Sequence, residues 1–221
     1  MEVQSIAEQK TDPSTEIKKA YLLKFPVAVW PMTRTRLDKI YSTLQRTFRG
    51  ERDRSPLIRQ LLDIAHDWDG QCWVALKDQA SFDAWFFSQI ESICRVPFAW
   101  SQAPKKGVPV VEHQHPSFDA AQKFLNLLLK DWWARSGQAA ELGAQCSNLH
   151  APLDDIVLSF VSRARPALRV PSSVVYELDK QTYATLQEVL YELPDELQMA
   201  LGCGYKLVRI EFEQLVWGWI R

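Results

Sequence analysis

The sequence predicts a helix-rich α+β protein, with six or seven helices and a few short strands near the N- and C-termini that form a small sheet. Apolar residues recur at helical spacing in several segments. Residues 208–213 alternate apolar and charged side chains, as a half-buried strand does, and residues 20–30 are apolar and partly β-branched. The hydrophobic content of 47% across 221 residues supplies a core of ordinary size.

The elements of the first third follow from periodicity and capping residues. A strand is expected over 20–30, and residues 33–50 predict a helix, since five apolar side chains follow i, i+3, i+4 spacing: Leu37, Ile40, Tyr41, Leu44 and Phe48. A second helix should begin at Ser55-Pro56, a cap followed by a proline at the first helical position, and end near His66. The sequence DWDG at 67–70 is typical of a turn, and 71–77 is a short strand candidate.

Helices dominate the middle of the chain. One should begin near Ser81, and another should run from Ser117 to about Arg135 with a single apolar stripe. Between them, residues 101–116 contain three prolines and indicate a loop or an extended edge. Residues 136–150 are small and polar, which favours a boundary.

The last third predicts two more helices and a strand. Pro152 should open one helix and Asp179 should cap another through Leu193, before the strand at 208–213. The domain organisation expected is a disordered leader at 1–17, a mainly helical part at 18–135, a linker or loop at 136–151, and an α+β part at 152–221, or else one domain over 18–221.

The basic stretch between Thr33 and Arg59 is the main functional signal. Eight basic residues face three acidic ones there, a net charge of +5 in a protein whose total is −1. Seven of the eight are arginines, whose planar guanidinium suits bidentate phosphate contacts. The predicted nucleic-acid-binding residues are Arg34, Arg36, Lys39, Arg46, Arg49, Arg52, Arg54 and Arg59. We therefore expect a non-enzymatic subunit or binding module that contacts RNA or DNA phosphates.

A protein–protein adaptor or inhibitor without a nucleic-acid partner is the alternative. Amphipathic helices commonly direct charge to solvent, and residues 177–213 carry a net charge of −5 that the basic stretch could face. The isoelectric point near 6.4 also lacks the global basicity of most free-standing nucleic-acid binders.

Tryptophan is abundant, with nine residues, and indicates a protein partner. Trp133 adjoins Trp132, and helix neighbours diverge by about 100°, so both cannot face one core. Trp217 and Trp219 would share a face if the C-terminal segment were a strand. The predicted partner-binding residues are Trp133, Trp217 and Trp219.

The chain carries little that indicates catalysis. His113 and His115 would project to the same side of an extended segment, so a metal-dependent hydrolase is a second alternative. His150 could form an acid–base group with Asp154 and Asp155, although acids at that position are better explained as favourable charges at a helix start. Phosphate-binding glycine loops and a nucleophile elbow are absent from the sequence. We expect no enzyme activity and no cofactor.

The expected location is the cytoplasm. No run of the sequence has the length and apolar character of a membrane span, so no membrane contact is expected. The polar, acidic start of the chain does not resemble a secretory signal. The four cysteines are scattered without close pairs, which favours buried thiols in a reducing compartment.

Overall fold

The structure is a computed structural model that describes residues 17, 48–49, 55–98, 100–102, 112–171, 178–201 and 208–219. The predicted strand at 20–30 and nearly all of the predicted helix at 33–50 lie outside these ranges. Within them the chain forms seven α-helices and one 3-10 helix: α3 (Ser55–Ala75), α4 (Gln79–Cys94), α5 (Phe118–Arg135), α6 (Gly137–Leu142), η1 (Gly143–Asn148), α7 (Asp155–Ala164), α9 (Lys180–Leu201) and α10 (Arg209–Trp219).

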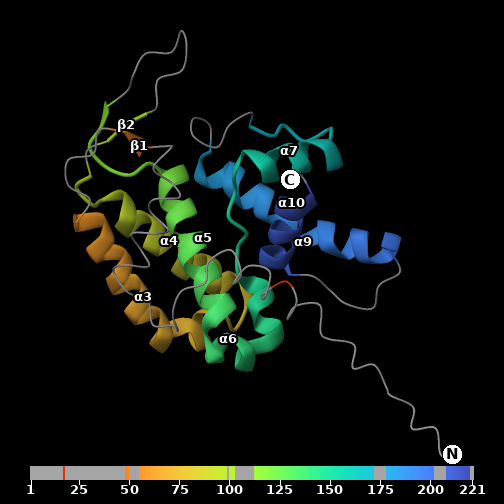
Figure 1. Ribbon diagram of the computed structural model, residues 1–221, viewed down its shortest axis with the longest axis horizontal. Helices are drawn as coiled ribbons and strands as arrows, with labels where there is room; N and C mark the ends of the chain where they lie inside the picture. Colours follow the sequence, from red (N-terminus) through yellow and green to blue (C-terminus); the bar gives the residue numbers. More distant parts are fainter. Residues whose placement is uncertain are drawn as a thin grey trace, which may run out of the picture.

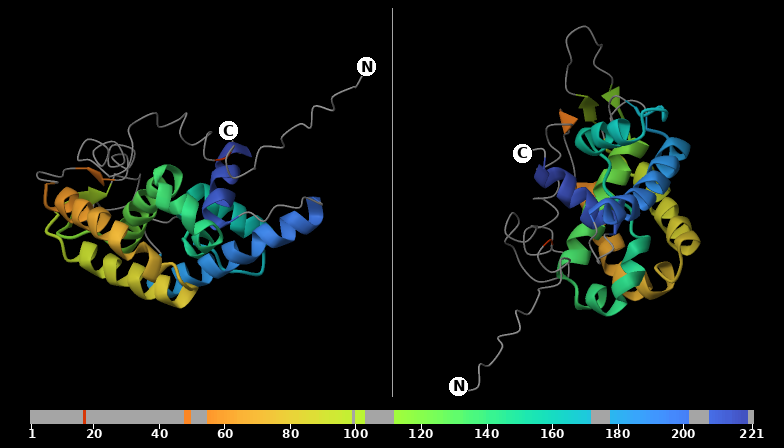
Figure 2. Two further views of the ribbon diagram at one scale, coloured as in Figure 1. Left: turned by 90° about the horizontal axis from the view of Figure 1, so that it is seen from below. Right: turned by 90° about the vertical axis from the view of Figure 1, so that its right-hand side faces the viewer.

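The helices form two groups that meet at α5 (Figure 1). Helices α3, α4 and α5 pack against one another on one side, while α7, α9 and α10 pack together on the other. The views in Figure 2 show that α9 extends away from this body at its far end. The buried apolar residues of both groups belong to one hydrophobic cluster, which includes Leu57 of α3 and Val216 of α10.

Capping residues set the starts of several helices; the Asp179 cap was predicted, whereas the Asp78 cap was not. Asp78 precedes α4, and its carboxylate accepts a hydrogen bond of 2.7 Å from the Ser81 backbone N–H. Asp179 caps α9 in the same way through Thr182 N–H, also at 2.7 Å. Asp154 accepts from Ile156 and Val157 at the start of α7, so the interpretation of Asp154 as a helix-start charge is confirmed.

The turn predicted at 67–70 and the strand predicted at 71–77 are wrong, because α3 continues through both to Ala75. The buried positions of α3 keep helical spacing across DWDG, and Trp68 is fully buried there. Its ring lies 4.3 Å from Trp85 and 5.3 Å from Trp132, centroid to centroid. Burying such a ring stabilises the helix by more than the roughly 1 kcal/mol that Gly70 costs in a helix interior.

The predicted small sheet near both termini is also wrong, and the described chain is essentially helical. The strand pairing it contains is a short antiparallel ladder of β1 (Phe48–Arg49), β2 (Trp100–Gln102) and β3 (Glu112–His113), in that order. Phe48 pairs with Gln102, and Trp100 pairs with His113. None of these strands comes from the C-terminal segment.

The segment expected to be the C-terminal strand is helix α10. Its alternation was misleading because both the apolar and the charged residues are buried, including Ile210, Phe212 and Glu213. The charged side chains find internal partners: the Glu211 carboxylate accepts a hydrogen bond of 3.1 Å from Val208 N–H, which caps the start of the helix.

The expected linker at 136–151 is a helical and partly buried segment. It contains α6 and η1, and Leu142 and Leu149 are buried in the hydrophobic cluster. The division of the chain into domains stays a prediction. Among the described residues, we find no helix with the length and apolar character needed to cross a bilayer.

Candidate functional site: a polar network behind a surface carboxylate

A network of polar side chains runs through the core between α4, α5, α9 and α10, and it reaches the surface at Gln79 and at the carboxylate of Asp83. The side chain of Asp83 is 39% exposed, whereas that of its partner His150 is 3% exposed. Oδ1 of Asp83 accepts two hydrogen bonds, from Nε2 of Gln79 at 2.6 Å and from Nε2 of His150 at 3.0 Å. Among the described residues, no hydrogen bond reaches Oδ2.

The branch through His150 has a defined direction. An ionised carboxylate only accepts, so the proton of His150 lies on Nε2, and Nδ1 of the neutral ring then accepts. The Tyr183 hydroxyl lies 3.1 Å from Nδ1 and therefore donates to it. That hydroxyl accepts a bond of 2.9 Å from Nδ2 of Asn126, which also donates to Oε1 of Gln122 at 3.0 Å. Each proton between Asn126 and Asp83 is thus donated toward the carboxylate.

The second branch begins at Arg209 of α10. Its guanidinium donates to Oε1 of Gln79 at 2.5 Å and to the carbonyl oxygens of Ser147 and Asn148 at 3.2 and 2.9 Å. The Gln79 side chain connects Arg209 to Asp83, because its amide oxygen accepts from Arg209 and its amide N–H donates to Asp83. Arg209 is 3% exposed, so a positive charge inside the protein stabilises the negative charge of Asp83.

Gln187 of α9 holds the backbone beside His150. Its amide oxygen accepts from Ala151 N–H at 3.0 Å, and its amide nitrogen donates to the Ala151 carbonyl at 2.7 Å. The His150 ring is enclosed by aromatic side chains, with ring centroids 4.9 Å from Phe82 and 4.7 Å from Phe86. These contacts fix the orientation of the imidazole.

Burial and hydrogen bonding shift the pKa values of three groups in the network, His150, Tyr183 and Asp83. Burial, with a smaller contribution from the Arg209 charge, lowers the pKa of His150 to about 4, against the opposing bond to Asp83. Burial also raises the pKa of Tyr183 well above its ordinary value. For Asp83, burial works to raise the pKa, but the bonds from His150 and Gln79 and the Arg209 charge outweigh it, so the pKa is lowered. At neutral pH the carboxylate is charged while the imidazole and the phenol are neutral.

This arrangement suits recognition better than catalysis. Tyr183 is fully buried, and His150 is almost so, and neither can reach a substrate outside the core. The charged group that solvent reaches is the Asp83 carboxylate, which is held in place by donors on Oδ1. A fixed anionic acceptor of this kind can bind a donor or a cation.

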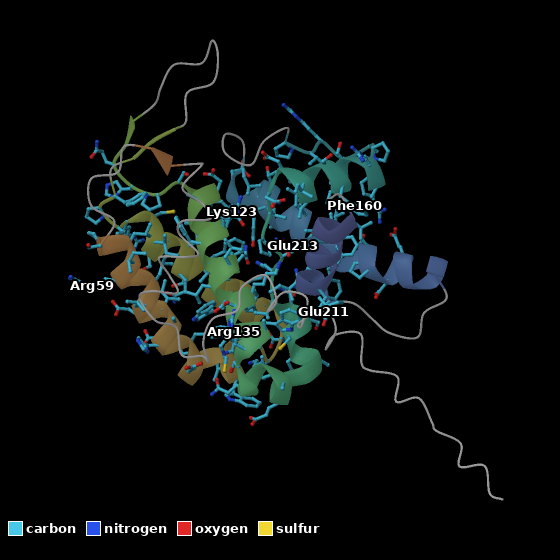
Figure 3. The ribbon with its side chains drawn as sticks, in the orientation of Figure 1. Arg59, Lys123, Arg135, Phe160, Glu211 and Glu213 are labelled. Carbon is cyan, nitrogen blue, oxygen red and sulfur yellow. The ribbon has the colours of Figure 1, made fainter. Side chains whose placement is uncertain are left out.

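Most of the predicted nucleic-acid-binding residues lie outside the described side chains: Arg34, Arg36, Lys39, Arg46, Arg49, Arg52 and Arg54, of which Arg49 has its backbone described in β1. Arg59 is described, and it is exposed on the first turns of α3. Figure 3 shows Arg59 at the outer edge of α3, directed away from the helical body.

The predicted partner-binding tryptophans are placed differently from one another. Trp133 is 2% exposed and lies in the hydrophobic cluster, so its ring is not at the surface. Trp217 and Trp219 belong to α10, and their side chains are outside the described ones. The shared face was expected from a strand, and the backbone of this segment is a helix instead.

The histidine pair gains no support as a metal site. His115 is exposed, and its Nδ1 lies 3.0 Å from the Val96 carbonyl oxygen, while the side chain of His113 is outside the described ones. Across the described ranges, no group of three or more His, Cys, Asp and Glu side chains has the geometry to hold a metal ion.

Sequence reasoning missed Asp83, Tyr183 and Arg209, and it gave His150 the wrong partner. His150 and Asp83 are 67 positions apart, so no local spacing connects them. The available signal was a pair of polar residues, Gln122 and Asn126, which lie one turn apart beside the apolar stripe of α5.

The chain has no match among protein-family models, curated proteins or solved structures.

Proposed function

We propose that the protein is a non-enzymatic binding module of a cytoplasmic assembly that contacts nucleic-acid phosphates through the basic segment, residues 34–59. The separation of charge along the chain carries this proposal. Residues 1–54 contain 11 Lys and Arg against 7 Asp and Glu, whereas residues 55–221 contain 15 against 20. The helical body is therefore acidic, and the excess of positive charge precedes it.

The cations of the body support this separation because many are already paired. Within the described part, five Lys or Arg side chains form ion pairs with carboxylates: Lys77, Arg95, Lys130, Arg135 and Arg165. Arg209 is buried against backbone carbonyls. A phosphate backbone would consequently meet the largest local excess of positive charge in the sequence at the basic segment.

The test is the binding of single- and double-stranded oligonucleotides, followed by fluorescence anisotropy over a range of salt concentrations. The logarithm of the association constant should fall with the logarithm of salt by about 0.7–0.9 for each phosphate neutralised. The double variant Lys39→Glu, Arg46→Glu should lose binding.

A matched control is Arg163→Glu, Arg169→Glu, which makes the same change in net charge at two exposed positions of the body. We expect this control to bind with most of the original affinity. If both variants lost the same affinity for oligonucleotides, net charge alone would explain the effect. If the Lys39→Glu, Arg46→Glu variant kept its affinity, the basic segment would not be the binding site.

A protein–protein adaptor is the second candidate, and one surface feature favours it. Trp73 is 45% exposed and its neighbour Val74 is 71% exposed, on the last turn of α3. Trp is over-represented at interface centres. This candidate predicts a defined complex by light scattering, with an absorbance ratio at 260 and 280 nm that indicates protein alone, and loss of that complex in Trp73→Ala.

A further inference from the structure

Two half-buried aromatic side chains, Phe87 and Phe118, lie near Asp83, and both pack against the buried Tyr183 ring. Phe87 follows Asp83 by four residues on α4, so both lie on the same helix face. The ring of Phe87 is stacked with that of Phe118, with centroids 6.4 Å apart, and both side chains are half-buried. Lys180 completes this surface, which we call the Asp83 patch: Asp83, Phe87, Phe118 and Lys180.

The Asp83 patch already holds one cation of its own. The Nζ atom of Lys180 lies over the Phe87 ring, 4.5 Å from the centroid. This distance is within the range of a cation–π interaction. Lys180 forms no ion pair with Asp83, so its ammonium takes the aromatic contact and leaves the carboxylate open. The patch thus combines two features that recognise a cation, an electron-rich ring face and a fixed negative charge.

The network behind the patch explains why the carboxylate is fixed. Gln79 and His150 both donate to Oδ1, so among the described residues Oδ2 remains as the acceptor without a hydrogen-bond donor. Such an internal chain is costly to maintain, because buried polar groups must all find partners. Two atoms in it go without one, Oδ1 of Asn126 and Nε of Arg209. A chain kept at this cost is consistent with positioning the carboxylate for binding.

We propose that the Asp83 patch is a docking point for an arginine side chain of a protein partner. A guanidinium can donate an N–H to Oδ2 while its plane stacks on the Phe87 ring in the place that Lys180 Nζ now takes, and an ammonium has no such plane. The acidic body attracts a cationic partner and repels the phosphate backbone of a nucleic acid, so a stacked base is the less favourable occupant. This site is separate from the basic segment and holds whether or not that segment binds nucleic acid.

The experiment titrates the full-length protein with a seven-residue Gly/Ser peptide that contains one central arginine, followed by amide chemical shifts in NMR. The same peptide with citrulline, an uncharged isostere of arginine, is the ligand control. We expect the arginine peptide to shift amides of α4 and of the start of α9, and the citrulline peptide to bind at least about tenfold more weakly.

Two variants, Asp83→Asn and Glu91→Gln, distinguish the effect of the Asp83 carboxylate from the effect of net charge. Asp83→Asn should weaken the arginine peptide by about tenfold or more, because it removes the charge and keeps the shape. Glu91→Gln, an exposed carboxylate of the same helix paired with Arg95, should change the affinity by less than about twofold. Lys180→Ala should strengthen binding about two- to fivefold, since it removes the competing cation from the Phe87 ring.

Lys180 is exposed, so this variant tests the proposal even if Asp83→Asn fails to fold. Shifts confined to other surfaces would overturn the proposal, as would equal affinity for the citrulline peptide or unchanged affinity in both Asp83→Asn and Lys180→Ala. A single-stranded oligonucleotide that shifts the same amides in place of the arginine peptide would also overturn it and assign the patch to nucleic acid.

Discussion

At the scale of single residues, His150 shows how burial and two hydrogen-bond partners decide a side chain's chemistry. Its Nε2 proton is committed to Asp83 and its Nδ1 lone pair to Tyr183, so a second proton on the ring would break the bond to Tyr183. Burial adds a desolvation cost to the imidazolium. The folded structure therefore requires the neutral ring, and lowering the pH should destabilise the folded protein.

We expect the free energy of unfolding to fall as the pH drops from about 6.5, the ordinary pKa of histidine, to about 4, the folded-state pKa of His150. In this range the unfolded chain binds a proton that the folded chain does not, so acid favours unfolding. The loss should be on the order of 3 kcal/mol. The lowered pKa of Asp83 acts in the same direction, because its protonation also favours the unfolded state.

Urea denaturation at pH 7, 6, 5 and 4.5 measures this slope, and the variant His150→Gln should flatten it although it is less stable at pH 7. His66→Gln, at an exposed histidine of α3, is the matched control and should keep the original slope. An unchanged slope in His150→Gln would mean that other groups produce the acid sensitivity.

At the scale of elements, the sequence predicted helices well where an apolar stripe and a cap agree. The predicted bounds of α5 fall within a residue of the observed ones, because Ser117 precedes a stripe that includes Phe124, Leu128 and Trp132. Prediction failed for α3 and α10, where strong local patterns misled. In α3 the residues DWDG suggested a turn, but Trp68 continues the buried stripe.

The error at α10 has a different physical cause. Alternation identifies a strand only if the charged residues face water, and here Arg209, Glu211 and Glu213 are all buried. Their partners, such as Gln79 and Lys130, come from distant positions that the sequence does not reveal. The candidate site was unpredictable for the same reason, since Asp83, His150 and Tyr183 meet only in the folded chain.

The continuity of α3 gives a test at this scale. A Cβ added at Gly70 meets no heavy atom within 4 Å, and the residue is exposed inside the helix. Gly70→Ala should therefore raise the free energy of unfolding by about 0.5–1 kcal/mol, because alanine has the higher helix propensity. The denaturation midpoint in urea measures this change.

Gly143 provides the contrast, because its φ of +51° lies in the left-handed region. Gly143→Ala has equal space but should lower the stability by about 1 kcal/mol through backbone strain. If Gly70→Ala instead lowered the stability, the result would indicate that the chain turns near Gly70, as predicted from the residues DWDG, and that α3 is not continuous there.

At the scale of the whole molecule, α5 joins the two groups of helices through polar as well as apolar contacts. Lys130 of α5 forms a buried ion pair with Glu213 of α10, and both side chains are 4% exposed. Figure 3 shows Glu213 in the interior where α10 approaches α5. Asn126 of α5 bonds Tyr183 of α9 as well. These connections predict that both groups unfold together.

Breaking the Lys130–Glu213 pair tests that cooperation. Glu213→Leu removes the carboxylate of this buried pair, and Lys130→Met removes its ammonium. Each single variant should lower the free energy of unfolding by about 3–5 kcal/mol. The double variant Lys130→Met, Glu213→Leu replaces both charges by apolar side chains and should recover most of this loss. Glu196→Gln breaks the more exposed pair with Arg165 and should cost less than about 1 kcal/mol.

The shape of the transition distinguishes the two ways in which the molecule can respond. If α5 couples both groups, tryptophan fluorescence and far-ultraviolet circular dichroism should report one common midpoint in every variant, with an unchanged dependence on urea. Two separated midpoints in Glu213→Leu would show that α7, α9 and α10 unfold independently, and the chain would then consist of two folding units. A single shifted midpoint follows from the one hydrophobic cluster that contains Leu57 and Val216.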